Sequence, residues 1–274
     1  NNWFGHVRYS TSGNKIQQTI QINEVNNLNK DTNFLNLTQP ILSSLFKEND
    51  FCFIYNGNIP MIIWKGIFKK YPELNEYYMT ENNINDSLLI IKLIQILKNH
   101  YYTNKKYLIT ENITLEQDKD ICITYILSTI ILLIERAFCI VIQMKDYCYV
   151  LRDSFGVRPL CFGLSEDNLS VIISSESCAF PDNYRLIDDI QPGMLISINN
   201  KTLNIKQLFK NNYNTNQKEN VKYFIFEYFY FMRKNTIANN ILVKDFRVNL
   251  GLLLHIELEK TKPQLNNYLK KNLK

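Results

Sequence analysis

The stretch FCFIYNGN, residues 51–58, is an unbroken apolar run that stops abruptly at Asn56-Gly57. A short continuous apolar run bounded by a turn signal predicts a buried strand. Buried strands belong to the inner layers of a domain, where other elements cover them. The stretch therefore predicts a packed sheet, and it places Asn56-Gly57 at the end of one of its strands.

The pattern around this strand predicts an α+β fold. Asp86-Ser87 is a helix N-cap signal, and apolar residues recur at helical spacing through residues 88–97. Residues 121–134 fit either a buried helix or a buried strand. The other strand signals are short, at residues 3–11, 137–143, 147–151, 160–164 and 169–174 and after Pro192-Gly193. A strand-rich chain with few helices predicts packed sheets rather than alternating βαβ units.

The sequence changes character towards its C-terminus. Residues 224–231 are an aromatic, strand-like run, and residues 242–260 have the pattern of a helix. Between residues 212 and 219, Asn, Gln, Thr and Lys crowd together, which is typical of a linker. We therefore expect one domain over residues 1–215 and the start of a second over residues 216–274.

Composition argues against several classes of protein. The chain has 274 residues, of which 46% are hydrophobic, so it can build a sizeable core. Its net charge of +5 is spread along the chain, and the basic run near the C-terminus has no interleaved aromatic residues, so we expect no nucleic-acid partner. No signal peptide opens the chain, and the longest apolar run is too short to span a membrane, which predicts a soluble, cytoplasmic protein.

The cysteines and histidines suggest neither a metal site nor a catalytic triad. The six cysteines sit singly in apolar segments, without the paired spacing of zinc ligands, and so they predict reduced core thiols. The three histidines, His6, His100 and His255, are scattered along the chain. We therefore expect no bound metal and no nucleophile–histidine pair.

Asn56-Gly57 is the sharpest local candidate for chemistry. A side-chain amide beside a backbone N–H at a strand end can form an oxyanion hole. Asn-Gly is also the commonest short hairpin turn, and local sequence alone favours that structural interpretation. Both interpretations stay open on these residues alone.

Two charged residues add a second feature. Arg8 at a strand end could bind a carboxylate through its fork of donors, while Asp86 at a helix start could bind an amino group. Taken singly, Arg8 is more often part of a structural ion pair and Asp86 more often an N-cap. Together with the amide donors of Asn56-Gly57 they fit recognition of a free amino acid. The polar run RDSFGVRP, residues 152–159, instead predicts a turn braced by internal ion pairs and a proline.

Several short motifs, taken in order, resemble one family. They are GHVRYST (5–11), YNGN (55–58), NDS (85–87), RDSFGVRPL (152–160), SESCA (175–179) and QPG (191–193). Their order resembles the class II glutamine amidotransferase domain, and the Asn-rich residues 14–36 look like an inserted surface loop in it. FEYFYFMR (226–233) followed by RVNLG (247–251) looks like the start of the phosphoribosyltransferase domain of amidophosphoribosyltransferase.

The resemblance implies a four-layer αββα N-terminal-nucleophile glutaminase, followed by the first elements of an α/β phosphoribosyltransferase domain. It implies that ammonia is released from glutamine and transferred to phosphoribosyl pyrophosphate, which forms 5-phosphoribosylamine in purine (IMP) biosynthesis. Arg8 and Asp86 would hold the glutamine α-carboxylate and α-amino groups, and Thr11 would support them. Asn56 and the N–H of Gly57 would form the oxyanion hole. The resemblance also implies a homo-oligomer.

The chain departs from this family at several points. The family's nucleophile is an N-terminal cysteine whose own α-amino group is the base, whereas this chain begins at Asn1. No acidic, Gly-containing phosphate loop precedes Lys274, so the expected Mg²⁺ site of the second domain is missing too. Tyr55 stands where the family usually has His. Phe224 stands where cluster-containing members have a cysteine, so we expect no iron–sulfur cluster. We therefore expect an inactive fragment.

Two alternatives stay open beside this hypothesis. One is another class II glutamine amidotransferase, such as glucosamine-6-phosphate synthase, because several enzymes share the first domain. The other is a non-catalytic relic that binds glutamine without hydrolysing it.

Overall fold

The computed structural model describes residues 52–80, 85–105, 115–144, 146–210, 224–262 and 271. The strand predicted at residues 3–11 and the loop predicted at residues 14–36 therefore lie outside the described residues.

The chain divides into two compact units. The first comprises Asn1–Arg158 and Gln191–Val221, and the second comprises Pro159–Ile190 and Lys222–Lys274. The second unit thus takes in strands that precede the predicted boundary between residues 215 and 216. The assignment of residues 1–215 and 216–274 to two functional domains stays a prediction.

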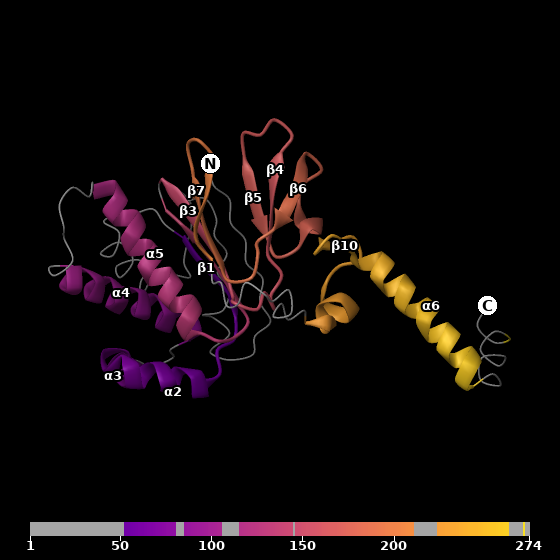
Figure 1. Ribbon diagram of the computed structural model, residues 1–274, viewed down its shortest axis with the longest axis horizontal. Helices are drawn as coiled ribbons and strands as arrows, with labels where there is room; N and C mark the ends of the chain where they lie inside the picture. Colours follow the sequence, from indigo (N-terminus) through magenta and orange to yellow (C-terminus); the bar gives the residue numbers. More distant parts are fainter. Residues whose placement is uncertain are drawn as a thin grey trace, which may run out of the picture. The chain divides into compact units, whose positions relative to one another are not determined.

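A five-stranded antiparallel sheet forms the centre of the first unit (Figure 1). Its strands, in spatial order, are β1 (Cys52–Gly57), β2 (Phe138–Gln143), β3 (Tyr147–Arg152), β7 (Met194–Asn199) and β8 (Ile205–Lys210). The predicted strand in residues 51–58 is confirmed as β1, and the predicted strands at residues 137–143 and 147–151 are confirmed as β2 and β3. The sheet and its helices confirm the α+β class.

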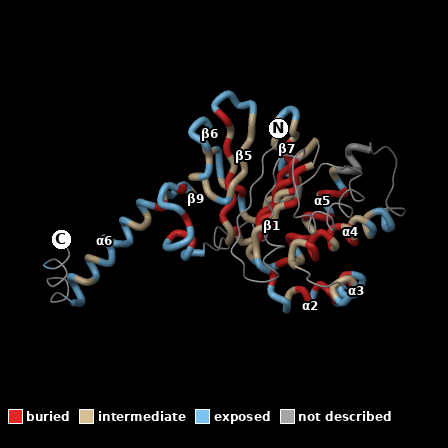
Figure 2. Tube along the Cα trace, turned by 180° about the vertical axis from the view of Figure 1, so that it is seen from behind, coloured by how far each residue is buried: buried red, intermediate tan, exposed pale blue. Residues whose placement is uncertain are grey.

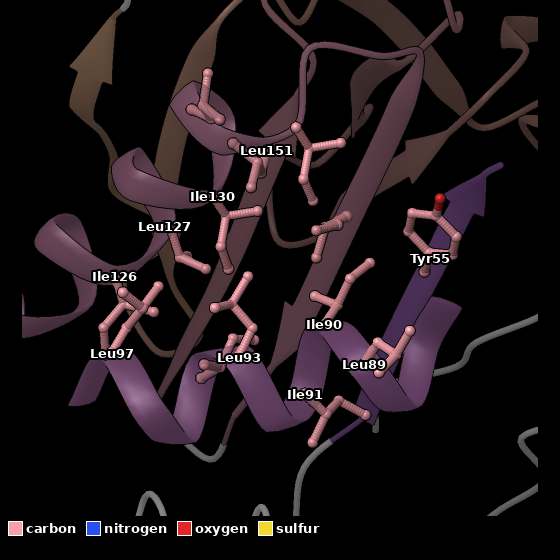
Figure 3. Packing of buried hydrophobic residues seen from close by; sticks show 14 of the residues in the cluster. Tyr55, Leu89, Ile90, Ile91, Leu93, Leu97, Ile126, Leu127, Ile130 and Leu151 are labelled. Carbon is pink, nitrogen blue, oxygen red and sulfur yellow. The ribbon is translucent and has the colours of Figure 1, made fainter. Parts of the chain in front are cut away.

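The described helices of this unit share one apolar core with the sheet. They are α2 (Met61–Lys70), α3 (Pro72–Thr80), α4 (Asp86–Lys105) and α5 (Leu115–Leu133). Figure 3 shows Leu93 of α4, Ile130 of α5 and the sheet residue Leu151 as members of one cluster of buried side chains, and all three are fully buried. Burying each such side chain contributes roughly 1.5–3 kcal/mol. This apolar layer therefore fixes where α4 begins relative to the sheet.

The segment left open between helix and strand, residues 121–134, lies mostly in helix α5. Two of its hydroxyl groups find hydrogen-bond acceptors inside the helix. Thr124 donates to the Asp120 carbonyl at 2.6 Å, and Thr129 donates to the Tyr125 carbonyl at 2.6 Å. Such bonds to the carbonyl four residues earlier let polar side chains lie in an apolar helix. Helix α4 is also confirmed, although it is longer than the predicted residues 88–97.

The second unit contains a three-stranded antiparallel sheet in the order β5-β4-β6. These strands are β4 (Cys161–Ser165), β5 (Val171–Ser174) and β6 (Tyr184–Asp189), and the short helix η2 (Ser177–Ala179) follows β5. Its C-terminal part contains η4 (Glu227–Phe231), β9 (Ile237–Ala238), β10 (Ile241–Leu242) and α6 (Val243–Thr261). Helix α6 confirms the helix predicted at residues 242–260, and Figure 2 shows most of it exposed.

The strand predicted at residues 224–231 is wrong, because Glu227–Phe231 form a π-helical turn. The Met232 N–H donates to the Glu227 carbonyl at 2.8 Å. The Arg247 side chain donates to the Tyr228 and Met232 carbonyls, at 2.7 Å each. An unbroken aromatic run has high strand propensity, but a distant arginine that satisfies its carbonyls stabilises the helical turn instead.

Hydrogen bonds tie the two sequence segments of the second unit together. The Glu176 carboxylate accepts from the Arg233 N–H at 2.7 Å and from the Thr236 hydroxyl at 2.6 Å. The Asp189 carboxylate accepts from the Asn239 N–H at 2.6 Å. Two carboxylates on the first segment therefore orient the backbone of the second, which explains why residues 159–190 group with the C-terminal part.

The described residues contain no candidate membrane span and no candidate metal cluster. Within the part of the chain that the structure describes, no helix is both long and apolar enough to cross a membrane, and no group of three His, Cys, Asp or Glu could hold a metal ion. The described cysteine side chains are free thiols, four buried and one half-buried. Burial raises the pKa of Cys148 to about 12, so this thiol stays protonated and behaves as a core residue, as predicted.

The loop after β3 is built around a buried carboxylate. Asp153 is fully buried and accepts hydrogen bonds from the backbone N–H groups of Phe155 at 2.9 Å, Val157 at 3.3 Å and Arg158 at 3.4 Å. Arg152 donates to the carbonyls of Arg158 and Gly156, at 2.8 Å each. The structural role predicted for residues 152–159 is confirmed, because hydrogen bonds between charged side chains and the loop backbone brace the turn. The predicted bracing by internal ion pairs and the proline stays a prediction.

Gly156 adopts a conformation that only glycine accepts easily at this position. Its φ is +66°, and an added Cβ would lie 2.5 Å from the Pro192 ring. We expect Gly156→Ala to lower the free energy of unfolding by roughly 2–4 kcal/mol, since it combines left-handed backbone with overpacking. Gly66→Ala is the matched control, because its Cβ would meet no atom within 4 Å. In chemical denaturation Gly66→Ala should be neutral or slightly stabilising, and equal effects of the two changes would contradict the assignment.

Burial controls the pKa of Asp153. Loss of water raises this pKa above its ordinary value of 3.8, although the three N–H donors and Arg152 oppose the shift. The folded protein therefore binds this proton more tightly than the unfolded chain, so the contribution to stability is greatest at low pH and is lost as the pH rises through the raised pKa.

We expect the difference in unfolding free energy between the wild type and Asp153→Asn to shrink as the pH rises above 3.8, and then to level off. The asparagine does not titrate, so the difference isolates this one carboxyl group. Urea denaturation of both proteins at a series of pH values measures it. A difference that grows with pH would show that the hydrogen bonds outweigh burial.

Candidate functional site

Asn56 and Gly57 form the end of strand β1 rather than a hairpin turn. Asn56 pairs with Cys139 and Gly57 with Phe138 in the neighbouring strand β2, and the chain then enters helix α2. A type I′ hairpin turn requires a positive φ at both central residues, and neither of these two residues has one. The hairpin interpretation is therefore wrong, and Asn56-Gly57 is left as a strand end beside a helix.

Gly57 is required by close packing. A Cβ atom at this position would lie 2.6 Å from the hydroxyl of Tyr55 and 2.9 Å from the carbonyl of Ala137. Real Cβ atoms do not approach other atoms so closely, so any side chain would displace the backbone or the tyrosine. Glycine thus brings the backbone of the strand end up against the Tyr55 ring.

Asp86 is the first residue of α4, and its carboxylate points back to the end of β1. Its Oδ2 accepts from the Ile59 N–H at 2.9 Å and from the Tyr55 hydroxyl at 3.5 Å. Its Oδ1 accepts from the Trp64 indole N–H at 2.9 Å. The carboxylate also lies in the first turn of α4, at the positive end of the helix dipole.

The N-cap role belongs to Asn85 and not to Asp86. The Asn85 side-chain oxygen accepts from the Leu88 N–H at 3.0 Å, which satisfies one of the unpaired donors of the first turn. The interpretation of Asp86 as a simple N-cap is therefore wrong. With the cap supplied by its neighbour, Asp86 can contact another part of the chain.

Tyr55 links the two candidate features. Its hydroxyl is 3.5 Å from Asp86 Oδ2 and 2.6 Å from the Cβ position of Gly57. The structure thus brings Asp86 close to the Asn56-Gly57 strand end, although 29 positions separate Gly57 from Asp86 in the sequence. Arg8 and Thr11, the other two predicted site residues, lie outside the described residues.

Sequence reasoning missed three members of this site. Trp64, Asn85 and the Ile59 N–H were not singled out, because helix α2 was not predicted and the loop before it could not be placed. The signal available for Asn85 was its position directly before Asp86-Ser87. For Trp64 no local signal exists, since only packing brings its indole to the start of another helix.

The arrangement suits a small ligand with an amino group. Asp86 is half-buried, and its described partners are neutral donors rather than cations. Within the described residues no salt bridge to Asp86 is formed, so its negative charge is available to an ammonium group. The adjacent strand end carries the side-chain amide of Asn56 and the backbone N–H of Gly57. Groups of these two types can stabilise an oxyanion.

The chain is similar in sequence to curated amidophosphoribosyltransferases, although no protein-family model matches it. It is 28% identical over 135 residues to the amidophosphoribosyltransferase of Mus musculus, which covers 44% of this chain and 25% of the relative. It is 24% identical over 255 residues to that of Methanothermobacter thermautotrophicus, which covers 92% of this chain and 43% of the relative. The chain thus spans less than half the length of these relatives, and the resemblance found in its motifs is confirmed.

The fold is also similar to a solved structure. The glutamine phosphoribosylpyrophosphate amidotransferase from B. subtilis, complexed with ADP and GMP, matches 76% of this chain with a TM-score of 0.53 and 23% sequence identity. The chain covers 38% of that protein. At this identity the likeness establishes the fold, and it confirms the predicted fold class.

The capping assignment can be tested by substitution. We expect Asn85→Ala to lower the free energy of unfolding by about 1 kcal/mol, because it leaves the Leu88 N–H without its side-chain acceptor. Asn85→Ser keeps a capping oxygen and should retain most of the stability. Thermal or urea unfolding of the three proteins measures the effect, and a full loss in both variants would contradict the cap.

Proposed function

We propose that this chain provides the glutamine site of an amidophosphoribosyltransferase, together with the beginning of its phosphoribosyltransferase domain. The observation that carries the proposal is the approach of the Asp86 carboxylate to the Asn56-Gly57 strand end through the shared neighbour Tyr55. Three further facts support it: the order of the motifs, the sequence similarity to curated amidophosphoribosyltransferases and the likeness of the fold.

In the proposed reaction the glutamine side-chain amide is hydrolysed and its ammonia displaces pyrophosphate from phosphoribosyl pyrophosphate, which yields 5-phosphoribosylamine for purine biosynthesis. Asp86 would bind the α-amino group of glutamine and Arg8 its α-carboxylate, with Thr11 as a supporting contact. The Asn56 side chain and the Gly57 N–H would donate to the oxyanion that forms on the amide carbon.

The nucleophile in this proposal is an N-terminal cysteine whose own amine is the base. The roles proposed for the residues of this chain are to bind and orient glutamine and to stabilise the oxyanion, and the hydrolysis also requires that cysteine. Mg²⁺ would neutralise the pyrophosphate at the second site, and no step assigned to this chain passes through it.

The setting of the reaction is part of the same proposal. The partners would be glutamine, phosphoribosyl pyrophosphate and further copies of the chain in a homo-oligomer, and the compartment would be the cytoplasm. The proposal includes no iron–sulfur cluster and no nucleic-acid partner.

Glutamine binding by the 274-residue chain is the first test. We expect calorimetry to detect binding of L-glutamine, and we expect Asp86→Asn to weaken it tenfold or more, because a charged partner of the α-amino group is lost. Asp120→Asn is the matched control, since Asp120 is also half-exposed but pairs with Lys206 at 3.2 Å. No binding by the wild type, or equal weakening in both variants, would contradict the proposal.

The acceptor is tested separately with the complete gene product. Ammonia release that is stimulated by phosphoribosyl pyrophosphate would identify an amidophosphoribosyltransferase. Stimulation by a hexose phosphate would instead identify a relative of glucosamine-6-phosphate synthase. Binding of glutamine without any ammonia release would leave the non-catalytic relic.

A further inference from the structure

Trp64 contacts the Asp86 carboxylate from a position that its packing fixes. Its indole N–H lies 2.9 Å from Asp86 Oδ1. The side chain is 1% exposed, and its ring stacks on Phe68 of the same helix with centroids 6.2 Å apart. A buried indole has little freedom to turn, so the donor is held in place before any ligand arrives.

Trp64 completes a set of three donors that come from three places. The Ile59 N–H belongs to the connection before α2, the Tyr55 hydroxyl to β1 and the indole to α2 itself. A carboxylate offers about four lone-pair positions. Three described donors therefore leave one position for a further donor, and each of them limits the rotation of the Asp86 side chain.

The charge of this group also points to a ligand. An indole N–H can only donate a hydrogen bond, so Trp64 can orient Asp86 but cannot itself accept a hydrogen bond from a ligand's ammonium group. Because the described donors are neutral, they hold the carboxylate without cancelling its charge. A fixed, half-buried carboxylate binds an ammonium more strongly than a freely rotating one, because its side chain loses less conformational entropy when the ligand binds.

We propose that Trp64 is a positioning residue for the substrate's α-amino group, acting through Asp86, and that it makes this site selective for α-amino acids over analogues without the amine. This inference rests on the proposed function, because it takes glutamine as the ligand. It adds a residue on helix α2 to the recognition of glutamine. It also predicts that the indole N–H affects binding of the ligand's α-amino group and of no other group of the ligand.

The test compares two ligands and two variants of the 274-residue chain. The ligands are L-glutamine and 4-carbamoylbutanoate, which is glutamine without its α-amino group. Trp64→Phe keeps an aromatic ring but removes the N–H. We expect it to weaken L-glutamine binding about fivefold to tenfold in calorimetry, while binding of 4-carbamoylbutanoate changes less than about twofold.

Asp86→Asn separates this inference from the proposed function. If Asp86→Asn weakens L-glutamine selectively and Trp64→Phe weakens both ligands equally or neither, Trp64 is only a packing residue and the inference is overturned while the function stands. If the wild type binds no L-glutamine, both are overturned. Selective weakening of L-glutamine by both variants supports the inference.

A second measurement avoids the risk that Trp64→Phe does not fold. The chain has two tryptophans, so its ¹H–¹⁵N spectrum contains two indole signals, and Trp3→Phe assigns them. We expect the Trp64 indole signal to shift on addition of L-glutamine and to shift much less with 4-carbamoylbutanoate. Equal shifts with the two ligands, or none with either, would overturn the inference.

Discussion

The burial of helix α4 against the five-stranded sheet positions the rest of the first unit. Its apolar side chains, among them Leu93 and Leu97, are fully buried in the core that also contains α5 and the sheet (Figure 3). Close packing of this kind leaves a helix no freedom to slide or rotate. The first residue of α4, Asp86, is therefore held at the end of β1, where its carboxylate accepts hydrogen bonds from β1, from α2 and from the connection between them.

Two carboxylates in this unit, Asp153 and Asp86, differ in burial and in hydrogen-bond partners. Asp153 is fully buried, and its described partners are N–H groups of its own loop, so it shapes the backbone. Asp86 is half-buried and accepts hydrogen bonds from residues far away in the sequence. The two aspartates therefore have different surroundings, for reasons that composition does not show.

Much of the fold was predictable because hydrophobic pattern and turn signals are local. Residues 137–143 and 147–151 are strands as expected, and residues 242–260 are helical. The failure at residues 224–231 has a physical cause, since an aromatic run without a clear period fits several structures. There the bonds from Arg247 decided the outcome, and such long-range bonds override local propensity.

Local sequence patterns were enough to predict the α+β class, the strand that ends at Asn56-Gly57, the helix start at Asp86 and the resemblance to a glutamine amidotransferase. They were enough because periodicity, caps and short motifs depend on neighbouring residues. The folded structure was needed to show that Asn56-Gly57 is not a hairpin, that Asn85 rather than Asp86 is the cap, and that Trp64 donates to Asp86. Those outcomes depend on how helices pack on a sheet, and packing joins residues that no sequence window contains.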